Sequence, residues 1–245
     1  MSIAIRPPFQ ILLEDGPCLA VLKPSGLLTE GPADIPSLVR QVKAWLALRH
    51  RKPGNVYLGI PHRLDRASSG IVLFARNSKA ARRLSEQFAE RSVRKTYLAI
   101  VEGQTPDTAT WQDWIRKIDE SASAEATEPD AEGAKRAKLT LRTISRTESE
   151  SLVEIEPETG RMHQIRVQFA TRGHAIRGDH LYGSTRDLVL PRPDDPREIP
   201  IALHHRSIRF QHPIRCEAVR ITAPVPESWR VPGLPDLPPE DQAAC

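Results

Sequence analysis

The sequence predicts an α+β fold with a mixed, largely antiparallel sheet flanked by helices and loops. Short apolar runs bounded by turn residues occur many times along the chain, whereas segments with helical spacing are few. The chain has 245 residues and is 39% apolar, which is enough for a substantial hydrophobic core. These observations favour many short strands with a few helices packed against them.

The first part of the chain mixes strand and helix patterns. Residues 37–49 have helical spacing, and Ser37, which follows Pro36, is a candidate N-cap. Ser78 is expected to cap the second helix. The predicted elements are strands at 9–13 and 18–22, a helix at 37–49, strands at 56–60 and 70–75, a helix at 78–90 and a strand at 92–101.

The second part of the chain contains an acidic segment and ends in a Pro-rich one. Residues 119–133 are expected to form a mobile insertion or a long hairpin loop, and residues 223–245 an extended, marginally ordered C-terminal tail. Residues 1–222 would then form a single domain. Strands are predicted at 137–144, 152–155, 207–210 and 217–221, and a helix closed by Gly173 is predicted at 162–172.

The charge distribution suggests a polyanionic partner. The net charge is +4, although residues 119–132 contain six acids and no Lys or Arg, so the rest of the chain is more basic than the total indicates. A basic body is typical of proteins that bind nucleic acid, although ordinary solubilising charge would give the same count. The sequence has no run near the roughly 20 apolar residues of a membrane helix, and its start lacks a signal-peptide pattern. A cytoplasmic location is therefore expected.

The cysteines suggest neither a disulfide framework nor a zinc site. Cys18, Cys216 and Cys245 are widely spaced and form no CxxC pair. We expect Cys18 and Cys216 to be small side chains in or near the core, and Cys245 to be an exposed free thiol.

The segment with the clearest chemical content is residues 61–70. Its single carboxylate, Asp65, lies in a predicted loop among arginines and hydroxyl residues, between two predicted strands that would hold the loop firmly. Such donors favour the ionised carboxylate, which can act as a nucleophile or a base. An isolated Asp is more often a structural ion-pair or turn residue, so this segment alone does not decide the function.

Two other segments could complete a site. Lys95 and Tyr97 share one face of a predicted strand and would offer a cation for phosphate beside a ring for base stacking; a half-buried core Tyr is the alternative. His163 and Arg166 share a face of the helix predicted at 162–172, from which Arg166 could reach Asp65 as a counter-ion. A surface arginine on an amphipathic helix is the alternative for Arg166.

Together these segments resemble the RluA-type family of RNA pseudouridine synthases. The similarity covers about residues 9–215, and it departs from the family at His205, where many relatives have Ala, and in the acidic segment. The matching motifs are Lys23-Pro24-Ser25-Gly26-Leu27, His62-Arg63-Leu64-Asp65 with Ser69-Gly70, Lys95-Thr96-Tyr97, Gly160-Arg161-Met162-His163-Gln164-Ile165-Arg166, Gly178-Asp179-His180-Leu181-Tyr182-Gly183, and Leu203-His204 with Phe210-Gln211-His212-Pro213.

The resemblance implies the pseudouridine synthase catalytic fold with a central active-site cleft, here as one catalytic domain. It implies an isomerase that converts specific uridines of structured ribosomal or transfer RNA to pseudouridine. Asp65 would be the nucleophile and Arg166 its ionic partner, while Tyr97 would pack on the uracil and could assist removal of the C5 proton. No cofactor, metal or obligate protein partner is implied, and a monomer is expected. The residues expected to bind substrate are Arg63, His62, Ile165, Lys95, Arg66 and Gln164.

Several alternatives remain open at this stage. Asp65 could attack C1′ of the ribose or C6 of the ring, or could abstract the C2′ proton to give a glycal. The chain could instead be a catalytically silent RNA-binding or ribosome-assembly factor, or an N-glycosidase that releases uracil. A metal-dependent nuclease is a further alternative, but its candidate ligands match no metal-binding spacing: His163, His174, Asp179, His180, His204 and His205.

Overall fold

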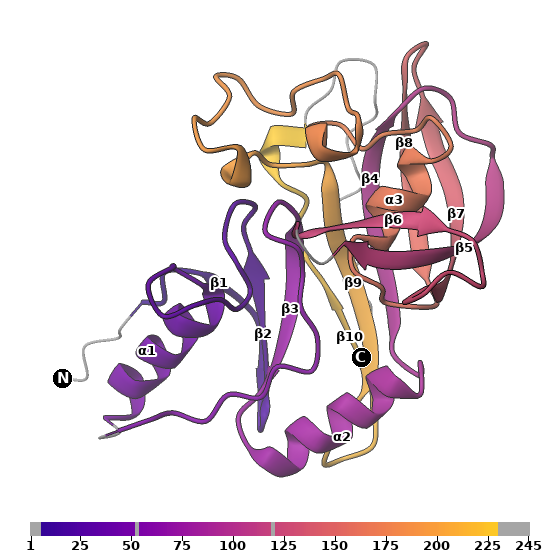
Figure 1. The fold of residues 1–245 in the computed structure, drawn as a ribbon. Helices are drawn as coiled ribbons and strands as arrows, with labels where there is room; N and C mark the ends of the chain where they lie inside the picture. Colours follow the sequence, from indigo (N-terminus) through magenta and orange to yellow (C-terminus); the bar gives the residue numbers. More distant parts are fainter. Residues whose placement is uncertain (1–5, 52–53, 119–120, 230–245) are drawn as a thin grey trace.

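The computed structural model describes residues 6–51, 54–118 and 121–229, which form helices and short 3₁₀ turns around one mixed sheet (Figure 1). The helices are α1 (Leu38–His50), α2 (Ser78–Ala89) and α3 (Gln164–Ala170), and the 3₁₀ turns are η1 (His180–Tyr182), η2 (Pro196–Glu198) and η3 (Glu227–Trp229). The strands are β1 (Gln10–Asp15), β2 (Cys18–Lys23), β3 (Ser69–Ala75), β4 (Arg94–Glu102), β5 (Thr108–Ile118), β6 (Ser123–Thr127), β7 (Lys135–Arg146), β8 (Glu150–Pro157), β9 (Leu203–Gln211) and β10 (Ala218–Thr222).

The sheet joins two groups of strands through β9. Its order is β1-β2-β3-β9-β4-β8-β7-β5-β6, with β10 paired to β9 outside this path. The β3–β9 pairing is parallel and the other pairings of the described strands are antiparallel. The α+β class with a largely antiparallel sheet is therefore confirmed.

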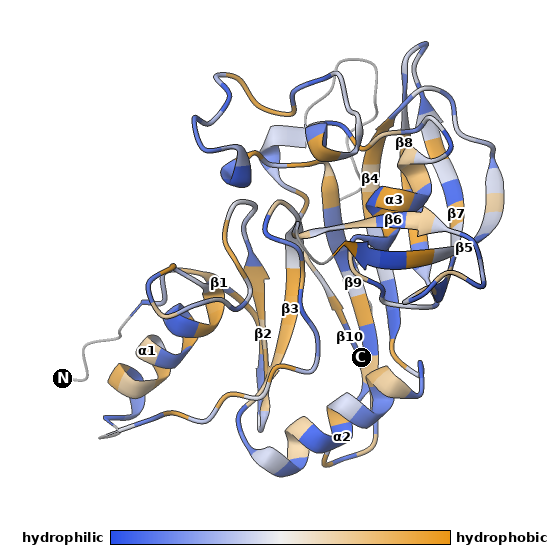
Figure 2. Ribbon diagram, in the orientation of Figure 1, coloured by the Kyte–Doolittle hydropathy of each residue, from blue (hydrophilic) through white to orange (hydrophobic). Residues whose placement is uncertain are grey.

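Strands β2 and β3 are buried on both faces. Alternate residues of a strand point to opposite sides, so Leu19, Val21 and Phe74 pack with the apolar face of α1. Ala20 and Leu73, on the other side, pack with Ala80 and Leu84 of α2. Cover on both faces explains why these strands are apolar along most of their length (Figure 2).

A second core lies where α3 packs on the other group of strands. Phe169 of α3 is fully buried and contacts the ring of Trp111 in β5, with 4.7 Å between the ring centroids. Ile165 belongs to the same cluster, together with Leu98 of β4 and Leu152 of β8. This packing fixes α3 on this group of strands, so the face of α3 bearing Arg166 is set relative to Tyr97 of β4.

Some predicted elements differ from those observed. β5 was not predicted. Its two buried apolar residues, Trp111 and Ile115, are four apart, a spacing that fits a helix as well as a strand. Residues 56–60 were predicted to form a strand, but they make only a single β-bridge, between Gly59 and Ala75. The acidic segment contains β6, paired with β5, so the expectation of a mobile insertion or plain loop is wrong for residues 123–127.

Helix boundaries also differ in detail. α1 has the expected helical spacing of buried residues, but Ser37 makes no side-chain capping bond. The buried residues are Leu38, Val39, Val42, Trp45 and Leu46. Asn77, rather than Ser78, caps α2, with its Oδ1 accepting from the backbone N–H of Ala80 at 2.8 Å. α3 begins only at Gln164 because His163 has φ of +51°, a left-handed conformation that cannot continue a helix.

The predicted tail and cysteines have mixed outcomes. Residues 223–229, expected to be marginally ordered, pack onto the core: Trp229 is buried against His204, with 5.9 Å between ring centroids. Cys18 is buried as expected, whereas Cys216 is exposed in the turn between β9 and β10. The prediction for Cys245 and the rest of the tail lies outside the described residues. Within the described residues, no helix has the length and apolar content needed to span a bilayer.

The parallel β3–β9 contact depends on a glycine. Gly70 pairs with His205, and a Cβ on Gly70 would lie 2.5 Å from the backbone N and O of His205. We expect Gly70→Ala to lower the free energy of unfolding by about 1–3 kcal/mol, because the strands must separate. Urea denaturation measures this. Gly160→Ala is the control, since no atom lies within 4 Å of its added Cβ; equal midpoints for the two variants would contradict the interpretation.

Candidate active site

Asp65 lies in a loop that precedes β3 and is tied to the chain after β2. The Thr29 hydroxyl donates to the carbonyl of Leu64 at 2.9 Å and accepts from its N–H at 3.1 Å. The N–H of Gly26 donates to the carbonyl of Arg66 at 2.8 Å. These bonds hold the backbone on both sides of Asp65, so the carboxylate is presented from a fixed position.

Lys23 also holds the loop that carries Asp65. Its side chain is fully buried, and its Nζ donates to the carbonyls of Pro24, Leu27 and Arg66 at 2.9, 2.7 and 3.2 Å. Burial lowers the pKa of Lys23 to about 7, although the nearby charge of Asp65 opposes this effect. The lysine thus joins the opening hairpin to the loop that carries Asp65.

Arg166 on α3 stands between two carboxylates. Its Nε and Nη2 donate to Asp179 at 2.7 and 2.8 Å, a bidentate pair between two buried side chains. Its Nη1 lies 3.5 Å from Oδ2 of Asp65. Burial lowers the pKa of Arg166, but the bonds to Asp179 outweigh burial and leave the pKa above its ordinary value. Asp179 therefore fixes the guanidinium, while Asp65, which is 29% exposed, stays accessible.

Tyr182 and His163 enclose the other side of Arg166. The guanidinium carbon lies 4.8 Å from the centroid of the Tyr182 ring. The Tyr182 hydroxyl lies 2.8 Å from Nδ1 of His163 and accepts from the N–H of Ala124 in β6 at 2.9 Å. Nε2 of His163 is 3.8 Å from Asp65, but burial lowers the pKa of His163, so this contact is not an ion pair near neutral pH.

Tyr97 on β4 completes the site. Its ring stacks on His205 with 4.6 Å between centroids and 16° between planes. Burial, together with the charge of Asp65, raises the pKa of Tyr97, so its hydroxyl remains protonated near neutral pH. His205 donates from Nδ1 to the carbonyl of Ile71 at 2.8 Å, and burial lowers its pKa to about 4. A neutral ring that is fixed in this way holds the Tyr97 ring at a defined angle.

One small cavity brings together Asp65, Tyr97, His163 and Arg166. The cavity has a volume of about 110 Å³, and among its lining residues Asp65 is the only carboxylate. Asp65, Tyr97 and Arg166, predicted as one site, therefore meet at one place although they come from a loop, a strand and a helix. The lining also includes Arg63, Lys95, His163, Gln164 and Ile165.

Two residues predicted to bind substrate have structural partners instead. Arg66 does not line this cavity: its Nε donates to the carbonyl of Gly26 at 2.8 Å, and its Nη2 pairs with Glu198 at 3.2 Å. The Gln164 amide reaches the cavity wall but is bonded to the Thr159 hydroxyl and the Lys138 carbonyl at 2.7 and 3.1 Å. These bonds hold both residues in place beside the site, and their contact with substrate stays a prediction.

His62, also predicted to bind substrate, lies on the far side of Tyr97 and His205. Its Nε2 accepts from the N–H of Leu73 at 3.0 Å, which fixes the neutral form with a hydrogen on Nδ1. The ring stacks on Phe88 with 4.8 Å between centroids. His62 lines a neighbouring larger cavity and not the one that holds Asp65.

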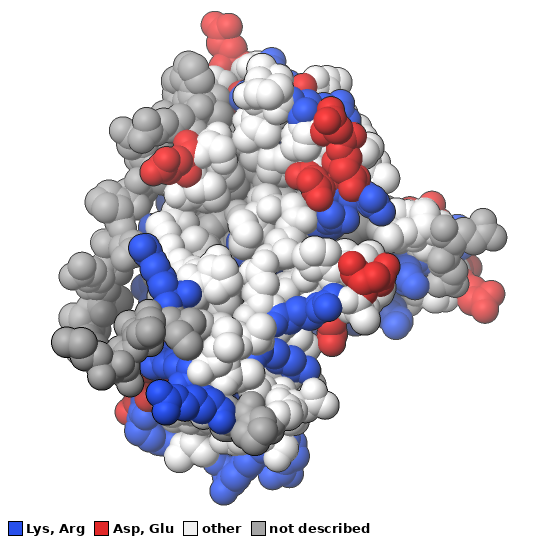
Figure 3. All heavy atoms as spheres, turned by 90° about the vertical axis from the view of Figure 1, so that its left-hand side faces the viewer, with Lys and Arg blue, Asp and Glu red and all other residues white. Residues whose placement is uncertain are grey.

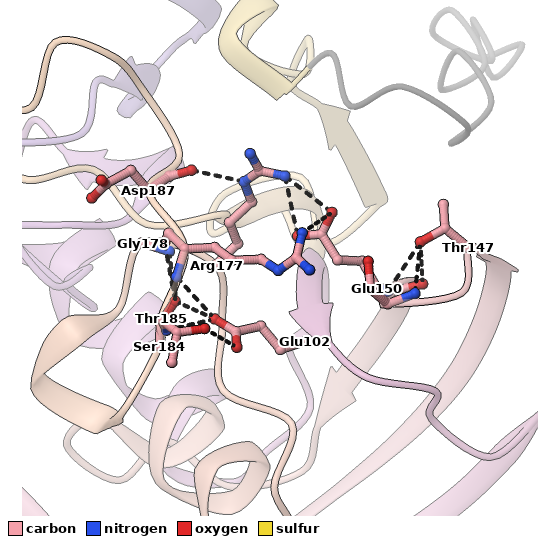
Figure 4. Close-up of polar contacts among 10 residues, drawn as sticks. Glu102, Thr147, Glu150, Arg177, Gly178, Ser184, Thr185 and Asp187 are labelled. Carbon is pink, nitrogen blue, oxygen red and sulfur yellow. Dashed lines mark hydrogen bonds and ion pairs between the residues drawn. The ribbon is translucent and has the colours of Figure 1, made fainter.

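A buried polar network anchors the loop that carries Asp179 (Figure 4). Arg177 donates to both carboxylate oxygens of Glu150 at 3.1 and 3.0 Å. Glu102 accepts from the hydroxyls of Ser184 and Thr185 at 2.7 and 2.9 Å. Burial raises the pKa of Glu102, but these hydrogen bonds outweigh burial and lower it overall. The loop is thus held at both ends around Asp179.

The residues considered as metal ligands are dispersed among other contacts. His204 bonds to Ser69 at 2.8 Å, His174 to the carbonyl of Glu102 at 3.1 Å, and His180 to Asp187 at 2.8 Å. In the described part of the chain, no group of three or more His, Cys, Asp or Glu side chains is placed to hold a metal ion.

Comparison with known proteins identifies the family. A family model described as RNA pseudouridylate synthase matches residues 18–171. The chain belongs to this family. Ribosomal large subunit pseudouridine synthase C of Pasteurella multocida is 37% identical over 237 residues, covering 91% of this chain and 67% of that protein. Synthase D of Xylella fastidiosa is 34% identical over 232 residues, covering 90% and 67%.

A solved structure supports the pseudouridylate synthase fold. The structure titled Human RNA Pseudouridylate Synthase Domain Containing 4 superposes with a TM-score of 0.72 at 23% identity, covering 90% of each chain. The present chain spans about two thirds of the length of its curated bacterial relatives. The expected resemblance to the RluA-type synthases is confirmed.

Several site residues of this pseudouridylate synthase were not assigned roles from sequence. Asp179 and Tyr182 belong to the Gly178–Gly183 motif, and Lys23 belongs to the opening motif, but spacing alone does not show what they contact. The sequence did mark these residues, because they lie in family motifs to which no chemical role had been assigned. His163 was placed on the face of Arg166, and the structure adds its contact with Tyr182.

The buried pair of Arg166 and Asp179 should dominate stability around the synthase site. We expect Asp179→Asn to lower the free energy of unfolding by about 3–5 kcal/mol, because it leaves a buried guanidinium without its charged partner. Glu86→Gln is the matched control: it breaks an exposed pair with Arg82 at 3.7 Å and should cost less than about 1 kcal/mol. Urea denaturation of both variants checks this, and similar losses would refute the assigned role of Asp179.

Lys23 should make stability depend on pH. In the unfolded chain this lysine stays protonated to about pH 10, whereas the folded protein releases the proton above about pH 7. The unfolded state then binds more protons, so wild-type stability should rise relative to Lys23→Met between pH 7 and 10, by up to about 1.4 kcal/mol per pH unit. Denaturation midpoints across this range test it; a constant difference between the two proteins would contradict it.

Proposed function

We propose that this chain isomerises specific uridines of large-subunit ribosomal RNA to pseudouridine, with Asp65 as the nucleophile. Its relatives include ribosomal large subunit pseudouridine synthases C and D, whose names support the RNA class. The observation that carries the proposal is the small cavity in which Asp65, the only lining carboxylate, meets Arg166 and Tyr97.

The reaction breaks the C1′–N1 bond of uridine, rotates the uracil and joins C5 to C1′. The proton leaves C5, N1 gains a hydrogen, and nothing is consumed, so the chemistry requires no cofactor. Asp65 attacks C1′ or C6, or removes the C2′ proton; all three routes place the same carboxylate beside the sugar and the ring. Arg166, held by Asp179, keeps a positive charge 3.5 Å from it.

The cavity walls retain the freed base. The Tyr97 ring offers one flat face, and Ile165 offers an apolar contact. The target uridine must leave its stack to reach Asp65, at a cost of roughly a few kcal/mol. Arg63, two residues before Asp65, is exposed and free to contact the RNA next to the flipped uridine.

Charge on the surface favours an RNA partner. Figure 3 shows Lys and Arg gathered mainly over the lower part of one face, while most acidic side chains of that face lie toward its upper and right-hand parts. Such separation attracts a phosphate backbone.

We further propose that residues 1–222 act as one catalytic domain, and that the chain works in the cytoplasm as a monomer without an obligate protein partner. Light scattering of the purified chain tests whether it is a monomer.

Asp65→Asn and Asp65→Ala should abolish pseudouridine formation while leaving RNA binding and stability near those of wild type. Carbodiimide-dependent primer-extension stops on ribosomal RNA measure the product and also map the uridine. Asp107→Asn, at an exposed ion pair with Arg146, is the control and should retain full activity.

Other outcomes of these experiments would contradict the proposed nucleophile, activity or RNA class. Turnover by either Asp65 variant would refute the nucleophile. Full biological function of Asp65→Asn without product would favour an RNA-binding or ribosome-assembly role, and release of free uracil by wild type would indicate an N-glycosidase. Stops confined to transfer RNA would overturn the proposed RNA class.

A further inference from the structure

A larger cavity adjoins the one that contains Asp65. Its volume is about 520 Å³, within the roughly 300–1,000 Å³ range of small-molecule sites, whereas the Asp65 cavity has about 110 Å³. The two cavities share wall residues, so they lie side by side. The shared residues are Arg63, Lys95, Tyr97, Thr159, Gly160 and Arg161.

Two cations without partners stand at the boundary between the cavities. The side chains of Arg63 and Lys95 make no hydrogen bond or ion pair with any of the described residues, although most other arginines near the site are paired. Lys95 is partly buried, and this burial lowers its pKa. A partly buried cation is stabilised by an anion, and a phosphate at this boundary would provide one.

The larger cavity is itself cationic. It is lined by Arg91 and Arg161 in addition to the two boundary residues, against a single acid, Glu158. That acid is already neutralised by Arg91 at 3.5 Å and by Lys138 at 2.7 Å. The space thus suits a ligand that carries negative charge.

Aromatic rings form another part of its wall. Phe88 and His62 line the cavity, and their rings stack on each other. Because Nε2 of His62 accepts from the N–H of Leu73, its Nδ1 carries the hydrogen, for which the described residues provide no acceptor. A flat ligand with a hydrogen-bond acceptor on its edge matches this wall, and a nucleobase has both properties.

We propose that the larger cavity is a second nucleotide subsite, which holds the nucleoside next to the target uridine. The phosphodiester between the two nucleosides lies on Arg63 and Lys95, with one base in each cavity. This inference rests on the proposed function, because it takes a uridine to occupy the Asp65 cavity. It makes the neighbouring base a determinant of which uridine is modified.

The first test changes the RNA. A stem-loop around the mapped uridine is prepared with an abasic residue on its 5′ side, on its 3′ side, or on neither. We expect one abasic substrate to lower kcat/KM by about tenfold or more, because a stacked base is lost. Equal kcat/KM for all three RNAs would overturn the second subsite. Failure of the unmodified stem-loop to yield pseudouridine would instead count against the proposed function.

The second test fills the cavity. Ser85 is an exposed residue of α2 that lines the larger cavity and not the Asp65 cavity. We expect Ser85→Trp to lower kcat/KM on the unmodified stem-loop about tenfold and to remove the difference between intact and abasic substrates. Glu86→Trp, at an exposed neighbouring position outside the cavity, is the control and should behave like wild type. Identical behaviour of the two tryptophan variants would overturn the proposal.

Discussion

The bidentate pair between Arg166 and Asp179 is the interaction on which the site depends. A buried guanidinium is costly without an anion, and Asp179 supplies both the charge and the geometry at 2.7 and 2.8 Å. Because Nε and Nη2 of Arg166 are bonded to Asp179, Asp65 lies in the field of the guanidinium, 3.5 Å from its Nη1, without holding it in place. The arginine thus has one carboxylate that fixes it and a second that stays accessible.

Two loops from different parts of the chain meet at this arginine, and each is fastened by its own residues. Lys23 and Thr29 hold the loop of Asp65 to the opening hairpin. Glu102 of β4 and the bond of Arg177 to Glu150 of β8 hold the loop of Asp179 to the sheet. The β3–β9–β4 arrangement brings the two loops together, because β9 joins the two groups of strands. Placement of the side chains around the Asp65 cavity is therefore a property of the whole sheet.

The sequence predicted much of this structure, since the apolar periodicity of β2, β3 and α1 matches their buried faces. It also brought Asp65, Tyr97 and Arg166 into one site through motif resemblance. β5 was missed because its buried residues have an ambiguous spacing. The helix at α3 was predicted, but with a start two residues too early, because His163 takes a left-handed conformation that no pattern signals. For Arg66 and Gln164, charge and polarity show what each side chain can bond, whereas only the fold shows that both also bond within the protein.

The link between β6 and Tyr182 changes how the acidic segment should be viewed. The phenol that packs on Arg166 is fixed by the backbone of Ala124, so a hairpin that looks peripheral supports a side chain at the centre. Engineers who trim surface hairpins to obtain a minimal scaffold would usually remove such a segment first. In this protein, trimming would release the aromatic support of the arginine, so the smallest working scaffold must retain the hairpin.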